Sequence, residues 1–318
     1  MTSYLVTGGC GFIGVNVVSR LVSQGARVRV LDDLSLGKRE DIEHLGVDLQ
    51  VGDIRDVETV QRACQGAEVV VHLAAHTRVV ESVAKPRLNF EVNALGTLNV
   101  LEACREAEVK KVILASTGGA ILGEQTPPVH EGMVPRPVSA YGASKLAGEK
   151  YCTSYANAYG MDITCLRYFS VYGPRGRPDQ VLYAFAEKAA RQEGPTIYGD
   201  GSYSRDFTYV SDVASATILA LYSDADGGRV LNIGFGKDYK VIDVARKVVA
   251  HYGGDQKIQF VKQYQGDFSR TLCDNDRARR VLGWRPATQF DEGLALFLDW
   301  FDTNRLPVLK GLGQFRHV

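Results

Sequence analysis

Short apolar runs rich in β-branched residues alternate with amphipathic stretches through the first half of the chain. The runs at 4–6, 27–31, 48–51, 68–73, 111–115 and 162–166 are predicted to be strands. The stretches at 16–23, 57–64, 95–106 and 143–159 carry apolar residues at i, i+3 and i+4, which predicts crossover helices. This alternation predicts an α/β fold with a doubly wound parallel sheet, covered by helices on both faces.

The alternation of predicted strands and helices ends after Pro174. Turn-rich segments at 176–179 and 194–205 surround one predicted helix near 181–191, which indicates a smaller lobe. The run at 230–234 is predicted to be a last strand that returns to the sheet, and helices near 241–252 and 276–282 are expected to rejoin the smaller lobe. We therefore assign 1–170, with 209–236 returning to it, to the larger domain, and 171–208 with 237–318 to the smaller, mainly C-terminal lobe.

The composition of the chain mainly indicates which partners, metal sites and locations are not expected. The 37 basic residues balance the 37 acidic ones, so charge gives no reason to expect nucleic acid or an anionic membrane as a partner. The six cysteines are scattered, with no CxxC pair and no cluster at metal-ligand spacing, so we expect no metal and a reducing compartment. No signal peptide or membrane-spanning run is evident, and the expected location is the cytoplasm.

A glycine-rich loop follows the first predicted strand and opens the first helix. It reads Thr7-Gly8-Gly9-Cys10-Gly11-Phe12-Ile13-Gly14. Such a turn lets backbone N–H groups and the helix dipole reach a pyrophosphate, which is the dinucleotide site of a Rossmann fold. Asp32 ends the second strand, where a carboxylate would accept the ribose 2′-hydroxyl and repel a 2′-phosphate, so NAD is favoured over NADP. A turn without a ligand would explain the glycines alone, but strand, helix and Asp32 are all in register.

Two later strand ends are placed to meet the same cofactor. Asp53 and Ile54 follow the third strand, near the expected adenine. Leu73, Ala74 and Ala75 close the fourth strand with side chains that would let the backbone approach the dinucleotide.

Tyr141 and Lys145 place a phenol and an ammonium four residues apart, on one face of a helix predicted to begin near Ala140. A lysine beside a tyrosine lowers the phenol pKa and makes it a usable base. The pair alone arises by chance on many helices. Ser116 and Thr117, however, end a strand at the carboxyl edge of the sheet, where either hydroxyl would hold a substrate hydroxyl against Tyr141.

Taken together, these motifs resemble the extended short-chain dehydrogenase/reductase superfamily, specifically its nucleotide-sugar epimerases and dehydratases. The resemblance extends over nearly the whole chain and includes Asn93 in an Asn-Ala-Leu-Gly-Thr run, the run from Arg167 to Arg175, and the run from Arg205 to Val210. It implies an NAD-dependent epimerase acting on a nucleotide sugar, most simply UDP-glucose and UDP-galactose, as a homodimer formed through helices near 90–104 and 144–159.

The resemblance also assigns roles. Tyr141 would take the proton of a sugar hydroxyl while the ring carbon passes hydride to NAD, with Thr117 or Ser116 sharing the hydrogen bond. Lys145 would hold the nicotinamide ribose. Cofactor contacts would come from Gly8, Gly11, Phe12, Ile13, Gly14, Asp32, Asp53, Ile54, Leu73, Ala74, Ala75, Asn93, Tyr141, Lys145 and Tyr168. Substrate contacts would come from Thr117, Tyr141, Ser170, Arg177, Arg205 on the diphosphate and Asp267 on the nucleoside ribose.

Departures from the family pattern bear on the reaction. Dehydratases carry an Asp-Glu pair directly after the catalytic threonine, whereas this chain has Gly118, Gly119 and Ala120, which favours simple epimerisation. Ser170 stands where hexose epimerases commonly have asparagine. The run 173–179 is similar to that of UDP-glucuronate 4-epimerases, and Arg175 or Arg177 would steady a sugar carboxylate there. A UDP-glucuronate 4-epimerase, a related dehydrogenase or reductase, and a non-catalytic NAD-sensing protein remain alternatives.

Overall fold

The computed structural model describes residues 2–223, 229–262 and 269–309. Its centre is a seven-stranded sheet in the order β11-β6-β5-β4-β1-β2-β3, and every neighbouring pair is parallel. The strands are β1 (Ser3–Thr7), β2 (Arg27–Asp32), β3 (Asp48–Val51), β4 (Val69–His72), β5 (Lys111–Thr117), β6 (Asp162–Tyr168) and β11 (Arg229–Ile233). The predicted Rossmann fold and its strands are confirmed.

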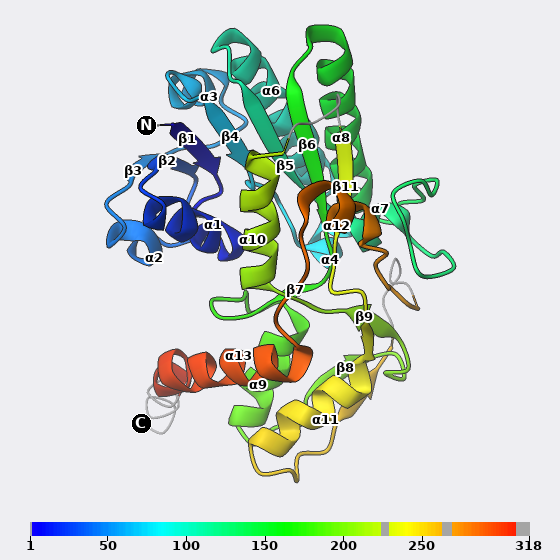
Figure 1. Ribbon diagram of the computed structural model, residues 1–318. Helices are drawn as coiled ribbons and strands as arrows, with labels where there is room; N and C mark the ends of the chain where they lie inside the picture. The colour runs from blue at the N-terminus through cyan, green and yellow to red at the C-terminus, as the bar shows by residue number, and fades with distance from the viewer. Residues whose placement is uncertain (1, 224–228, 263–268, 310–318) are drawn as a thin grey trace.

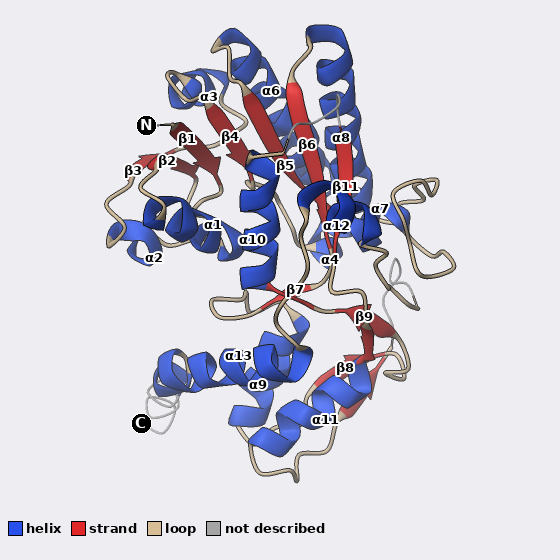
Figure 2. Ribbon diagram, viewed as in Figure 1, coloured by secondary structure: helices blue, strands red, loops and turns tan. Residues whose placement is uncertain are grey.

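The strand sequences are apolar almost throughout because both faces of the sheet are buried. Along β1, Leu5 packs with the core on one side, whereas Tyr4 and Val6 pack with the core on the other. Helices α1 (Phe12–Ser23), α2 (Glu40–Glu43) and α10 (Val210–Leu221) contribute to the first core, and α3 (Val57–Cys64), α6 (Gly96–Glu106) and α8 (Ala140–Tyr159) to the second. Figure 2 shows the strands between these helical layers. Parallel strands need such cover, since connecting helices lie on both faces.

A smaller lobe lies beyond the sheet. Its core is formed by α9 (Val181–Ala190), α11 (Val241–His251) and α13 (Phe290–Asn304), which Figure 1 places together at one end of the molecule. Short strand pairs accompany it: β7 (Val171–Tyr172) with β10 (Thr208–Tyr209), β8 (Thr196–Tyr198) with β13 (Gln259–Val261), and β9 (Ser204–Asp206) with β12 (Asp238–Lys240).

One segment is not where the sequence analysis placed it. Helix α12 (Asp276–Leu282) was expected in the smaller lobe, but it packs against β11 and α10, and Ala278 and Leu282 belong to a sheet core. Trp284 explains the difference, because its buried indole Nε1 donates to the carbonyl of Asp212 (3.0 Å) and to Ser215 Oγ (3.0 Å), both on α10. A large aromatic group with a satisfied N–H anchors this segment to the larger domain.

The remaining short helices line the edge of the sheet at which the strands end. These are α4 (Val79–Ala84), α5 (Pro86–Phe90), the π-helical turn η1 (Glu91–Leu95) and α7 (Gly118–Leu122). No helix in the described part of the chain is long and apolar enough to cross a membrane.

Candidate active site

The glycine loop lies between the ends of β1 and β4, where the strand order reverses. Gly8 has φ +70°, and a Cβ there would stand 2.6 Å from the backbone nitrogen of Ala74. A Cβ on Gly14 would stand 2.1 Å from the carbonyl oxygen of Gly8. Only glycine permits either approach, so the loop, the first turn of α1 and the end of β4 form one close-packed backbone surface. Ligands of open α/β sheets bind at this switch point.

The start of α1 is open to an anion. Gly11 is the N-cap residue, and no side chain caps the helix. The first N–H groups of a helix have no partner within it, and the dipole adds positive potential there. The loop from Gly8 to Gly14, which includes Phe12 and Ile13, therefore fits a pyrophosphate group.

Asp32 lies at the end of β2 beside the loop, as expected. It is 6% exposed, and its carboxylate accepts hydrogen bonds from the backbone N–H of Cys10 (2.9 Å) and of Leu34 (2.9 Å). Burial raises the pKa of this carboxyl, and the two backbone hydrogen bonds oppose that rise. The acidic group is thus fixed against the glycine loop.

The other predicted cofactor contacts lie along the same edge. Asp53 pairs with Arg55 (Oδ2–Nε 2.9 Å), which lowers its pKa, and Ile54 packs on Gly96 of α6. Leu73 N donates to the carbonyl of Thr7 (3.0 Å), and Ala74 N donates to Thr7 Oγ1 (3.3 Å), so the segment 73–75 stays next to β1.

Tyr141 and Lys145 both lie on α8, and their positions are fixed from the helix N-terminus. Ser139 caps the helix by accepting from Gly142 N (3.1 Å), and Ser82 Oγ accepts from Tyr141 N (3.1 Å). Gly142 allows the helix to lie against α7, since a Cβ there would stand 2.1 Å from the carbonyl oxygen of Ala120. The first turn of α8 is therefore held by contacts from two other elements.

The two candidate hydroxyls at the end of β5 face different partners. The side chain of Thr117 lies close enough to Tyr141 to lower the pKa of the phenol. Ser116 Oγ instead donates to Glu149 Oε1 (2.6 Å) in the interior and is 5% exposed. Both partners lie on α8, but Glu149 is two helical turns beyond Tyr141, so Ser116 is engaged further along the helix and Thr117 is the hydroxyl at the phenol.

The electrostatics of Tyr141 differ from expectation. We expected Lys145 to lower the phenol pKa. In the protein alone, burial raises the pKa of Tyr141, and the opposing groups are the Arg177 charge and the Thr117 hydrogen bond. Lys145 is itself buried, which lowers its pKa to about 8. The guanidinium of Arg177 is therefore the cation that acts most on Tyr141 in this structure.

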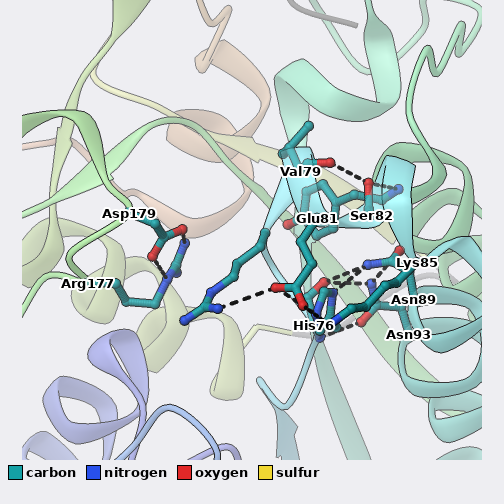
Figure 3. Close-up of polar contacts among 11 residues, drawn as sticks. His76, Val79, Glu81, Ser82, Lys85, Asn89, Asn93, Arg177 and Asp179 are labelled. Atoms are coloured by element: carbon teal, nitrogen blue, oxygen red, sulfur yellow. Dashed lines mark hydrogen bonds and ion pairs between the residues drawn. The ribbon is translucent and has the colours of Figure 1, made fainter. Parts of the chain in front are cut away.

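Arg177 reaches this centre from the loop after β7. It forms a fork with Asp179 (Nε–Oδ1 2.9 Å, Nη2–Oδ2 3.1 Å). In Figure 3, this pair stands opposite a second charged cluster in which Glu81 binds Arg78 (3.3 Å) and Lys85 (2.8 Å). Arg175, the alternative named from sequence, points elsewhere, because its Nε pairs with Asp41 on α2 (3.3 Å).

Several predicted residues lie in other surroundings. Asn93 is buried in η1, where it accepts from His76 N (2.8 Å) and donates to Ser144 Oγ (3.0 Å), as Figure 3 shows in part. Tyr168 bonds Thr217 on α10 (2.8 Å). Ser170 is partly buried just after β6, and Arg205 lies on β9, with its Cζ 4.8 Å from the centre of the Tyr203 ring. Asp267 lies outside the described residues.

Two buried polar groups beside the site were not singled out from the sequence. His72, at the end of β4, bonds Thr7 Oγ1 (2.6 Å) and Thr97 Oγ1 (3.1 Å), and burial lowers its pKa to about 3. Glu149 lies one turn beyond Lys145 on α8 and pairs with Arg167. The i, i+4, i+8 spacing of Tyr141, Lys145 and Glu149 was the available signal for the second group.

Comparison with known families agrees with this geometry. A model described as the NAD dependent epimerase/dehydratase family matches residues 4–234. The chain belongs to this family. It is accordingly an epimerase-type enzyme with NAD as its cofactor, and the glycine loop with Asp32 fits that cofactor.

Individual relatives match over almost their whole length. UDP-glucose 4-epimerase of Mycolicibacterium smegmatis is 36% identical, with 93% of this chain and 97% of the relative covered. UDP-glucuronate 4-epimerase of Thermodesulfobacterium geofontis is 33% identical, with 98% and 99% covered. The structure of Thermus thermophilus UDP-glucose 4-epimerase in complex with NAD superposes with a TM-score of 0.90 at 39% identity, covering 95% of this chain and 100% of that one.

The different partners of Thr117 and Ser116 generate a prediction. We expect Thr117→Val to lower kcat by about 10- to 100-fold, because a hydrogen bond to a group that becomes charged contributes about 1.5–3 kcal/mol. Thr117→Ser, which keeps a hydroxyl, should retain most of the rate. Steady-state kinetics on purified variants measure both effects.

Ser116→Ala is the matched comparison at the neighbouring position. It should leave kcat within a few-fold of the parent but lower the free energy of unfolding by about 1–3 kcal/mol, since the buried Glu149 carboxylate loses a partner. A larger loss of kcat in Ser116→Ala than in Thr117→Val would reverse the assignment.

Proposed function

We propose that this enzyme is a nucleotide-sugar 4-epimerase that interconverts UDP-glucose and UDP-galactose by transient oxidation at C4. The observation that carries the proposal is that Thr117, at the end of β5, acts on Tyr141 beside buried Lys145, at the edge of the sheet that carries the glycine loop. These groups supply acid–base chemistry and no more, which is what reversible oxidation of one hydroxyl requires.

The reaction assigns one task to each side chain. Tyr141 takes the proton from the sugar O4 hydroxyl, and Thr117 holds that oxygen in line. NAD, when bound, would supply the hydride acceptor for C4 and the hydride donor for the reverse transfer. Tyr141 then gives its proton back to O4, so the residues and the cofactor end in their starting state. The positive charge of Arg177 favours the phenolate form of Tyr141.

The residues that would hold NAD are those along the carboxyl edge of the sheet. Gly8, Gly11, Phe12, Ile13 and Gly14 would bind the pyrophosphate, and Asp32 the adenosine ribose. The segments with Asp53 and Ile54 and with Leu73, Ala74 and Ala75 would border the adenine half. Lys145, Tyr168 and Asn93 would border the nicotinamide half. Asn93 would act there through its hydrogen bond with the backbone N–H of His76.

Substrate contacts are proposed on the lobe side of the site. Arg205 lies on β9, which pairs with β12 of the smaller lobe, and would meet the diphosphate of the nucleotide. Asp267 would bind the nucleoside ribose. Ser170 and Arg177 lie on the connection into the lobe and would contact the sugar. The sugar would then lie between the two halves of the molecule.

The segment after Thr117 argues against loss of water from the substrate. An elimination needs a further acid and base, and Gly118, Gly119 and Ala120 provide neither. Close packing explains the first glycine, because a Cβ on Gly118 would stand 2.1 Å from Cε2 of Phe169. A carboxylate at that position would not fit without displacing this ring.

One observation favours UDP-glucuronate as a second candidate substrate. The Arg177 charge lowers the pKa of Tyr141, and the same guanidinium would pair with a carboxylate at C5 of a bound sugar. The named relatives include enzymes of both kinds. A non-catalytic NAD sensor has no comparable support, since the acid–base pair is complete.

We also propose that the enzyme is a homodimer formed through α5, η1 and α8. Large apolar side chains are exposed on these elements: Phe90 is 57% exposed, Leu95 39%, Tyr151 41% and Tyr159 56%. Neighbouring exposed apolar groups of this size are characteristic of an interface.

Tyr141→Phe tests the reaction itself. Removing the acid–base hydroxyl should lower kcat for UDP-galactose by about 10²- to 10⁴-fold, whereas the Kd for the nucleotide sugar should change little. Epimers are measured at C4 after incubation with a panel of UDP- and dTDP-sugars, and Tyr222→Phe, at an exposed tyrosine, is the control. NAD released on denaturation should match the protein concentration. Retention of most of the rate would refute the mechanism.

Arg177→Met tests the choice of sugar. For UDP-glucose we expect a change in kcat/KM of less than about tenfold, and for UDP-glucuronate a loss of about tenfold or more, because a charge-assisted hydrogen bond is removed. Arg175→Met, on the same loop but paired with Asp41, is the control and should alter neither. If the wild-type kcat/KM is higher for UDP-glucuronate than for UDP-glucose, UDP-glucuronate becomes the proposed substrate and UDP-glucose the second candidate.

Phe90→Glu tests the proposed interface. Sedimentation velocity of the wild type should give twice the 34.8 kDa mass of the chain, and the variant should dissociate to the single chain. Phe260→Glu is the control, since Phe260 is equally exposed at 54% but lies on β13 of the smaller lobe. A wild-type protein that sediments as a single chain would contradict the proposal.

A further inference from the structure

Three ionisable residues follow one another along the buried side of α8. Tyr141, Lys145 and Glu149 are spaced by four residues, so they lie on successive turns of one face. Lys145 is 4% exposed and Glu149 2% exposed. The mechanism uses the first two, whereas the third is a buried carboxylate that it leaves without a role.

Glu149 is held by contacts from two strands. Arg167 of β6 donates from Nε to Oε1 (2.8 Å) and from Nη2 to Oε2 (2.7 Å), and Ser116 of β5 donates to Oε1 (2.6 Å). A bidentate arginine and a hydroxyl donor stabilise the ionised carboxylate and fix its orientation. Glu149 therefore carries a negative charge at a defined position, one helical turn from Lys145.

Arg167 is not fully satisfied by this pairing. Its Nη1 is buried and has no hydrogen-bond partner in the described part of the chain. Leaving a buried guanidinium N–H unpaired costs free energy that a purely structural ion pair would avoid. Arg167 thus fixes the Glu149 carboxylate of α8 while one of its own N–H groups stays unpaired.

Glu149 is the charged residue nearest to Lys145 along α8, one helical turn away on the same face. No hydrogen bond or ion pair links its ammonium to another side chain of residues 2–223, 229–262 or 269–309. Burial disfavours the charged form and lowers the pKa to about 8, and Glu149 is the first of the groups that oppose this. The others that face it are Cys152 on α8 and Cys165 on β6, while His72 on β4 is neutral.

We propose that Glu149, fixed by Arg167 and Ser116, is a positioning residue that keeps Lys145 in its ammonium form at the pH at which the enzyme works. The proposal rests on the proposed function of Lys145 beside Tyr141. Removing the Glu149 charge leaves Lys145 and Arg167 as buried cations without that counter-charge, and the ammonium is then the one that gives up its proton, because a guanidinium does not.

Glu149→Gln is the decisive variant, and its first readout does not require turnover. NMR of protein labelled with ¹³C-lysine follows the titration of the Lys145 ammonium through its Cε signal. The Lys145→Met variant, in which this signal is missing, provides its assignment. We expect its midpoint to fall by about one pH unit or more in Glu149→Gln. In the pH profile of kcat, the fall at high pH should occur at a pH lower by the same amount. The KM for UDP-glucose should change less than about twofold, since substrate binding is not affected.

Two further variants separate charge from structure. Ser116→Ala removes a hydrogen bond to Glu149 but no charge, so the Lys145 titration should stay within about 0.3 pH units of the parent. If Glu149→Gln fails to fold, the double variant Glu149→Gln/Arg167→Met removes both buried charges and should show a smaller downward shift than the single one. Glu149→Asp should restore part of the parent profile.

The outcomes distinguish this inference from the proposed function. An unchanged Lys145 titration in Glu149→Gln, or in the double variant, would overturn the inference even if stability fell. A shifted titration in a protein that epimerises no UDP-sugar would leave the inference standing and refute the proposed function.

Discussion

The close contact between the glycine loop and the end of β4 is the constraint on which the rest of this enzyme depends. Gly8 lies so near the backbone of Ala74 that no side chain fits between them, and Gly14 brings the first turn of α1 equally near the loop. The contact occurs where the strand order reverses, between β1 and β4. It therefore aligns the open helix N-terminus, Asp32 and the 73–75 segment along one edge, and every other functional group is positioned relative to that edge.

The reacting groups are brought to this edge by a helix whose buried side is polar. Burying charged side chains is costly unless they are paired, and α8 meets that cost with Arg167 and Ser116 around Glu149. The same burial excludes water from Lys145, which strengthens the electrostatic effect of each charge on its neighbours. The side chains of Arg167 and Ser116 thus both join the sheet to α8 and fix the charge of Glu149 near the acid–base groups.

The interleaving of the two lobes has a functional consequence. The chain leaves the sheet after β6, builds part of the smaller lobe, returns for α10 and β11, and returns again for α12 and Trp284. Several crossings tie the lobe to the sheet edge near Thr117 and Arg177. A substrate held by both halves would be positioned by several separate connections rather than by a single hinge.

The amino-acid sequence by itself determined the strands, the helices of the sheet, the glycine loop, Asp32 and the pair Tyr141 and Lys145, because each depends on local periodicity or on spacing within one element. Only the tertiary structure decided which hydroxyl lies at Tyr141, since Ser116 and Thr117 are adjacent and meet different turns of the same helix α8. It also decided that Arg177 rather than Arg175 acts on Tyr141, that α12 packs on the sheet, and that Glu149 meets Arg167. These are contacts between residues distant in sequence, and no pattern along the chain specifies which of several suitable partners lies within reach.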